Sequence, residues 1–192
     1  EKGYATEVIT QDALNWLDTI SKTKPFALFL HHKAPHLNFV PALKYLEIYH
    51  KKKFPEPATL YNSMEGHGAA WQQQTMGILE VMRLSADLKI DPVFLNDIPS
   101  LQPDKTDIAT YQAIIKRLPP EERQRYQEIY AERGQIIQRE KPTGKKLLHY
   151  KYQWYMQDYI ACIASVDESV GRVLDRLDKD KLADNTVVIY TS

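Results

Sequence analysis

The sequence predicts an α/β fold, and more specifically part of an α/β/α sandwich in which a largely helical insertion separates two buried strands. Three observations support this class. Residues 26–30 and 187–190 are apolar at every position, which is typical of strands buried on both faces of a parallel sheet. Helical periodicity dominates the residues between them. The longest helical pattern, residues 149–178, leads directly into the second strand, as in a strand–helix–strand unit.

The first expected element is an amphipathic helix over residues 6–22. Its apolar residues, among them Leu14 and Leu17, recur at helical spacing, and Thr6 is a suitable N-cap residue. Pro25 prevents the helix from continuing. The first strand, residues 26–30, follows at once.

Further helices are expected over residues 41–50, 67–87, 106–117 and 120–139. Pro120, followed by two glutamates, marks the start of the last of these, because proline fits the first turn and acidic side chains favour the positive end of the helix dipole. A second proline, Pro142, interrupts the chain before the long helix of residues 149–178. Since two strands cannot form a sheet alone, we expect the chain to be an internal segment of a longer protein.

The composition excludes several classes of function. The 192 residues carry 25 basic and 25 acidic side chains, so the overall charge favours neither a nucleic-acid partner nor an anionic membrane surface. No apolar run approaches the roughly 20 residues that a membrane-spanning helix requires. The single cysteine, Cys162, excludes an internal disulfide, and it lies on the apolar side of the predicted helix as a core thiol.

The segment His31–His36, which reads His-His-Lys-Ala-Pro-His, follows the first strand. Ligands of open α/β sheets bind beyond the carboxyl ends of strands, where this loop is expected. The ammonium of Lys33 and the imidazole of His36 suit a sulfate or phosphate, and imidazole can also protonate a leaving oxygen. Two alternatives remain open. The histidines could be ordinary surface residues, or they could bind a metal, which the neighbouring cation disfavours.

Four aromatic residues at the start of the long helix allow two interpretations. They are Tyr150, Tyr152, Trp154 and Tyr155. At helical spacing they are expected to pack in the core, and the alternative is that they line a carbohydrate cleft.

The loop and the C-terminal region together resemble one family. The stretch from Pro25 to His36 is similar to the "PFFLxxxxKxPHxP" segment of the sulfatases of the alkaline-phosphatase superfamily. Residues 159–192 resemble, in order, the family's "DxxVGxVLxxL" helix, its "LxDNT" turn and its "VVxxTSD" strand. The resemblance implies that residues 1–192 are one internal segment of a sulfatase catalytic domain, with residues 1–50 and 147–192 as core elements and about 51–146 as a helical insertion.

The resemblance also implies a chemistry. The family hydrolyses sulfate esters with a formylglycine, made from Cys or Ser in a Cys/Ser-x-Pro-x-Arg motif, and with a calcium ion. By that likeness His36 is the catalytic histidine that contacts the sulfate and assists the leaving group. Lys33 lies beside it as a second substrate-binding residue. The implied substrate is a sulfated carbohydrate, as in glycan-degrading bacterial sulfatases, and the implied location is periplasmic or secreted.

The sequence departs from the family in one respect that matters for catalysis. No Cys/Ser-x-Pro-x-Arg motif occurs in it. We therefore expect this segment to supply the sulfate-binding loop without the nucleophile or metal ligands, to bind no cofactor itself, and to need the remainder of a sulfatase chain for turnover. Two other functions stay open: a phosphoesterase or phosphomutase of the same superfamily, and a non-catalytic domain that binds an anion or a glycan.

Overall fold

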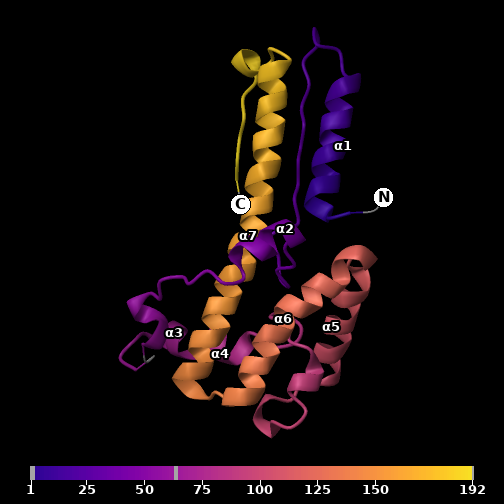
Figure 1. Cartoon of the computed structure of the whole chain (residues 1–192). Helices are drawn as coiled ribbons and strands as arrows, with labels where there is room; N and C mark the ends of the chain where they lie inside the picture. Colours follow the sequence, from indigo (N-terminus) through magenta and orange to yellow (C-terminus); the bar gives the residue numbers. More distant parts are fainter. Residues whose placement is uncertain (1–2, 63–64, 192) are drawn as a thin grey trace. The chain divides into compact units, whose positions relative to one another are not determined.

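The computed structural model describes residues 3–62 and 65–191. Its helices (Figure 1) are α1 (Ala5–Thr19), α2 (Leu43–Tyr49), α3 (Ala69–Gln73), α4 (Ile78–Val81), α5 (Lys105–Arg117), α6 (Pro120–Glu140) and α7 (Gly144–Lys179). Short 3₁₀ turns lie at Ala58–Tyr61, Pro92–Phe94, Pro99–Leu101 and Ala183–Asn185. In this described part of the chain, no helix combines the length and apolarity needed to cross a membrane.

Five of the helices confirm the sequence analysis. Helices α1, α2, α5, α6 and α7 lie where the apolar periodicity predicts them, with ends that differ by a few residues. Helix α6 begins at Pro120, with Glu121 and Glu122 in its first turn. It ends at Lys141, which adopts the left-handed conformation (φ 43°) and donates its backbone N–H to the Ile137 carbonyl over 2.8 Å.

The chain divides into two compact units, which are described separately. The first contains residues 1–36 and 162–192. Within it, α1 lies along the C-terminal half of α7 (Figure 1), and polar contacts join the two helices. Arg172 donates to Gln11 over 2.7 Å, while Arg176 pairs with Asp18 and, over 2.9 Å, with Asp180.

The two predicted strands are not formed in the described residues. Residues 26–30 and 187–190 carry no strand hydrogen bonding there, and Figure 1 draws both as coil. Residues 187–190 are exposed, with Ile189 at 81%, and Phe29 is 79% exposed, whereas Phe26, Leu28 and Leu30 are half-buried. A strand needs a hydrogen-bonded neighbour on at least one side, and no other extended segment of the described chain pairs with either of them. The α/β/α sandwich is therefore not confirmed by this chain.

The second unit contains residues 37–161, with α2 to α6 and the first half of α7. It has two apolar clusters. One consists of Leu84, Leu88, Ile90, Leu95, Ile98, Ile137, Leu147 and Trp154, and the other of Leu46, Leu118, Tyr126, Ile129 and Tyr130. Helix α6 contributes to both clusters, so its packing holds this unit together.

The prediction of one helix over residues 67–87 is wrong. Helices α3 and α4 are separate short turns, and residues 84–90 form an irregular segment that is almost wholly buried. Backbone turns and carboxylates together satisfy its N–H groups: Leu88 and Ile90 donate to the carbonyls of Arg83 and Leu84 over 3.1 and 3.0 Å, and two aspartates accept from other N–H groups. Asp87 accepts from the Arg83 N–H over 2.8 Å, and Asp107 on α5 accepts from the Ala86 N–H over 2.7 Å. Because buried N–H groups need acceptors, these two aspartates permit a buried loop where periodicity predicts a helix.

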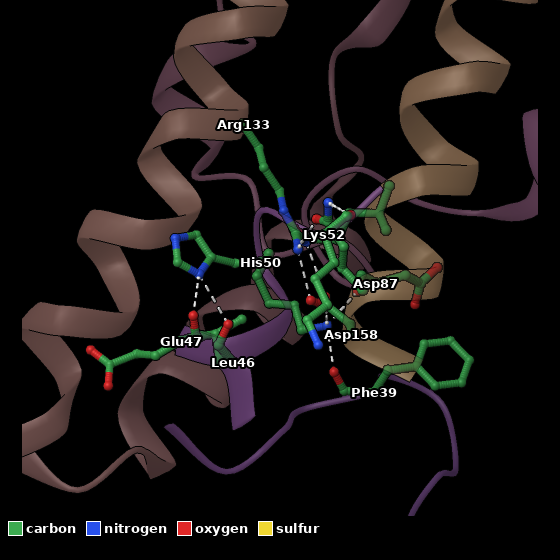
Figure 2. Close-up of polar contacts among 11 residues, drawn as sticks. Phe39, Leu46, Glu47, His50, Lys52, Asp87, Arg133 and Asp158 are labelled. Carbon is green, nitrogen blue, oxygen red and sulfur yellow. Dashed lines mark hydrogen bonds and ion pairs between the residues drawn. The ribbon is translucent and has the colours of Figure 1, made fainter. Parts of the chain in front are cut away.

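A buried ion cluster lies at the end of this segment (Figure 2). The ammonium of Lys89 donates to a carboxylate oxygen of Asp158 and to the backbone carbonyls of Phe39 and Asp87, each over 2.7 Å. The guanidinium of Arg133 on α6 donates two hydrogen bonds to the same carboxylate, over 2.7 and 3.0 Å. All three charged side chains are at most 4% exposed. One carboxylate thus compensates two buried cations.

Replacing the central carboxylate should be costly. We expect Asp158→Ala to lower the free energy of unfolding by about 3–5 kcal/mol, because it leaves two buried cations without a counter-ion. Urea unfolding followed by circular dichroism measures this. The matched control is Asp175→Ala, which removes an exposed aspartate from the same helix. Equal stability of the two variants would contradict the role given to Asp158.

Candidate functional site

The loop His31–His36 belongs to the first unit and ends in a turn at Ala34 and Pro35. The His36 backbone N–H donates to the Lys33 carbonyl over 2.9 Å and closes the turn. The side chains of Lys33 and His36 are both exposed. The two residues singled out in the sequence therefore flank one hydrogen-bonded turn, and both can reach a ligand from solvent.

The other two histidines of the loop differ from each other. His31 is exposed, and its ring meets Phe29 edge to face at a centroid distance of 6.1 Å. His32 is partly buried, and neither of its ring nitrogens finds a partner among the described residues. Burial lowers the pKa of His32 from its ordinary value, so its imidazole is neutral near pH 7. His32 therefore adds no positive charge to the loop.

The groups that the sulfatase resemblance implies are not provided by these residues. In residues 3–62 and 65–191, no set of three or more His, Cys, Asp or Glu side chains is arranged to hold a metal ion. Cys162, the one cysteine, is buried on α7 and is followed by Ile-Ala-Ser, which does not fit formylglycine formation.

The four aromatic residues at the start of α7 divide between the two interpretations. Tyr152 is buried and donates its hydroxyl to the Pro55 carbonyl over 2.8 Å, and Tyr155 is half-buried with its ring against Phe39. The rings of Tyr150 and Trp154 stack at 5.2 Å and line a cavity of about 560 Å³.

The sequence analysis missed the polar residues of that cavity. Glu56 and His149, 93 positions apart, are joined there by a hydrogen bond between the Glu56 carboxylate and Nδ1 of His149. The two prolines beside Glu56 indicate a rigid stretch of chain. They do not indicate that Glu56 meets His149, because that contact depends on how α7 packs against this stretch.

The comparisons with known proteins confirm the resemblance to sulfatases. A family model described as "Sulfatase" matches residues 1–192. The chain belongs to the sulfatase family. It is 40% identical, over all 192 residues, to an N-acetylglucosamine-6-O-sulfatase of Bacteroides thetaiotaomicron, of which it covers 33%.

A solved structure gives the same result in three dimensions. It is described as BT4656 in complex with its substrate, D-glucosamine-2-N,6-O-disulfate. The TM-score is 0.83 at 39% identity, and the match covers 97% of this sulfatase chain and 36% of BT4656. The chain thus spans about a third of the length of the relatives that it matches.

The environment of His32 predicts a pH dependence. An imidazole whose pKa is lowered by folding binds its proton less readily in the folded than in the unfolded state. Stability should therefore fall as the pH drops through the ordinary histidine pKa of 6.5 towards the lower value of the folded state.

We expect His32→Gln to lose less stability than the wild type between about pH 7 and about pH 5, measured by urea unfolding. His67→Gln, at an exposed histidine, is the control. An NMR titration of the His32 ring with a midpoint at or above 6.5 would contradict the expectation.

Proposed function

We propose that this chain forms part of the catalytic domain of an enzyme that hydrolyses sulfate esters on glycans, and that Lys33 and His36 contact the sulfate group. The main support for the proposal is the turn closed by the hydrogen bond from the His36 N–H to the Lys33 carbonyl. This turn places an ammonium and an imidazole on one short, exposed loop. Membership of the sulfatase family supports the reaction class.

The chemistry of the two side chains fits separate roles. The Lys33 ammonium is a compact positive charge with three donors, which suits the oxygens of a sulfate. The imidazole of His36 can act as a general acid that gives a proton to the sugar oxygen as the bond between sulfur and that oxygen breaks. The nucleophile and the metal of such an enzyme lie outside the residues of this chain.

The relatives favour an amino-sugar substrate. One is named for N-acetylglucosamine 6-sulfate hydrolysis, and the other is described with a sulfated glucosamine. A sulfate ester at the 6-position of a glucosamine unit is therefore the substrate that we propose. The location proposed for the enzyme is outside the cytoplasm, where sulfated glycans occur.

The exposed apolar segments fit a sheet in the longer protein. Residues 26–30 and 187–190 have the composition of buried strands, and in this chain Phe29 and residues 187–190 are exposed to solvent. We propose that both pair with further strands of a sulfatase α/β/α sandwich. Such pairing would place the loop of residues 31–36 at a strand end, where ligands of α/β sheets bind.

The proposal is tested in the full-length protein that carries this chain, by sulfate release from N-acetylglucosamine 6-sulfate. We expect His36→Ala to lower kcat by about 10²–10⁴-fold, as expected for loss of a positioned general acid. Lys33→Gln should mainly raise KM, because it removes a charge that binds the sulfate in ground and transition states alike. His67→Ala serves as the control at an exposed histidine.

The same assay separates the alternative functions. An unchanged rate in His36→Ala would remove this residue from the mechanism. Faster hydrolysis of N-acetylglucosamine 6-phosphate than of the sulfate would favour a phosphoesterase. Sugar binding without turnover of either ester would favour a non-catalytic glycan-binding protein.

A further inference from the structure

A cavity of about 560 Å³ lies within the unit of residues 37–161, a size typical of small-ligand sites. The segment after α2, helix α6 and the first turns of α7 supply its walls. Its lining includes His50, Lys53, Glu56, His149, Tyr150 and Trp154. None of these residues belongs to the loop of residues 31–36, so the role proposed for that loop leaves the cavity unexplained.

One wall of the cavity is aromatic. The rings of Tyr150 and Trp154 stack on each other with a tilt of 15°, and Trp154 is buried in the apolar core, so the half-buried Tyr150 is the more accessible ring of the pair. The face of an aromatic ring carries partial negative charge, which attracts the weakly positive C–H groups on the face of a sugar ring. This wall therefore suits a pyranose better than a purely charged ligand.

Two imidazoles of the lining are fixed in one tautomer. The Nδ1 atom of His50 lies 3.1 and 3.0 Å from the carbonyl oxygens of Leu46 and Glu47 (Figure 2). Carbonyl oxygens only accept hydrogen bonds, so Nδ1 carries the hydrogen and Nε2 of the neutral ring remains an acceptor. His50 can therefore accept a hydrogen bond from a sugar hydroxyl.

Glu56 orients the second imidazole in the same way. Its carboxylate contacts Nδ1 of His149 and also accepts from the Tyr61 hydroxyl over 2.6 Å and from Gln153 over 3.3 Å. The hydrogen bond from Tyr61 keeps the pKa of Glu56 below its ordinary value, so the carboxylate is ionised and only accepts. His149 therefore also keeps Nε2 for a ligand.

One cation of the lining, Lys53, has no counter-ion among the residues that the structure describes. Lys51 pairs with Glu132 over 3.3 Å, and Arg133 pairs with Asp158 in the buried cluster. Lys53 is exposed and makes no ion pair with any described residue. An anionic substituent on a bound sugar would supply the missing charge.

We infer that this cavity binds one sugar ring that carries a sulfate or carboxylate group. The ring lies against Tyr150, which stacks on Trp154, its hydroxyls donate to His50 and His149, and its anionic group meets Lys53. The choice of a glycan as the ligand rests on the proposed function, whereas the preference for an anionic group rests on Lys53. The cavity would thus hold a second unit of the glycan whose sulfate ester is hydrolysed.

Tryptophan fluorescence of the full-length protein tests whether the cavity is occupied. The ligands are glucosamine 6-sulfate, glucuronate and neutral N-acetylglucosamine, which separate sulfate, carboxylate and uncharged sugars. We expect the anionic sugars to change the emission and Trp154→Phe, which retains an aromatic ring in the core, to abolish that change. Trp71→Phe, at an exposed tryptophan that does not line the cavity, should leave it intact. Persistence of the signal in Trp154→Phe would overturn the inference.

A charge variant tests the choice of ligand. We expect Lys53→Gln to weaken binding of the anionic sugar about tenfold, the loss typical of one charge-assisted hydrogen bond, and to leave binding of N-acetylglucosamine unchanged. Lys116→Gln, at an exposed lysine outside the cavity, is the matched control. Equal affinity of Lys53→Gln and the wild type for the anionic sugars would overturn the preference for an anion.

The two proposals can fail separately. His36→Ala should lose turnover and keep the Trp154 response, because His36 does not line the cavity. Full activity of His36→Ala with an intact Trp154 response would refute the mechanism proposed for the loop and leave the cavity inference standing. Turnover that depends on His36, without any Trp154 response to the three sugars, would refute the cavity inference alone.

Discussion

The carboxylate of Asp158 is the constraint on which the unit of residues 37–161 depends. It is the counter-ion of Lys89 and Arg133, both buried, and through them it joins α7, α6 and the irregular segment of residues 84–90. Burying charge is unfavourable unless every donor and acceptor is matched, and Lys89 meets this requirement with three bonds of 2.7 Å. The same cluster determines where Arg133 stands in the wall of the cavity. The ion cluster around Asp158 therefore supports both the core of this unit and one wall of the cavity.

The sequence allowed prediction of the parts of this fold in which local chemistry and tertiary structure agree. Pro120 with two following glutamates begins α6, and the apolar periodicity of residues 149–178 lies within α7. The prediction failed where tertiary contacts override local pattern. Residues 84–90 are apolar enough to resemble a helix, yet they form a loop in which backbone turns and the carboxylates of Asp87 and Asp107 accept the N–H groups. No local signal indicates that a carboxylate on α5 will accept from Ala86.

The residues of the candidate site and of the cavity also differ in how far the sequence alone could identify them. Lys33 and His36 could be named because the residues of one turn are close in the sequence, and the structure joins them through one backbone hydrogen bond. The polar residues of the cavity could not be found in this way. Glu56 and His149 are brought together by the packing of the segment after α2 on α7. The sequence indicated four aromatic residues, but only the fold shows that Tyr150 and Trp154 line the cavity and that Tyr152 and Tyr155 do not.

The buried position of Lys89, Arg133 and Asp158 has a consequence for protein engineering. Programmes that raise solubility usually change charged residues first, on the assumption that charge marks the surface. In this sulfatase chain three strongly charged side chains are among the least accessible. A library that varies all lysines, arginines and aspartates alike would lose its folded members at these positions, and the loss would be misread as intolerance of the surface. Sorting such positions by accessibility before synthesis avoids that error.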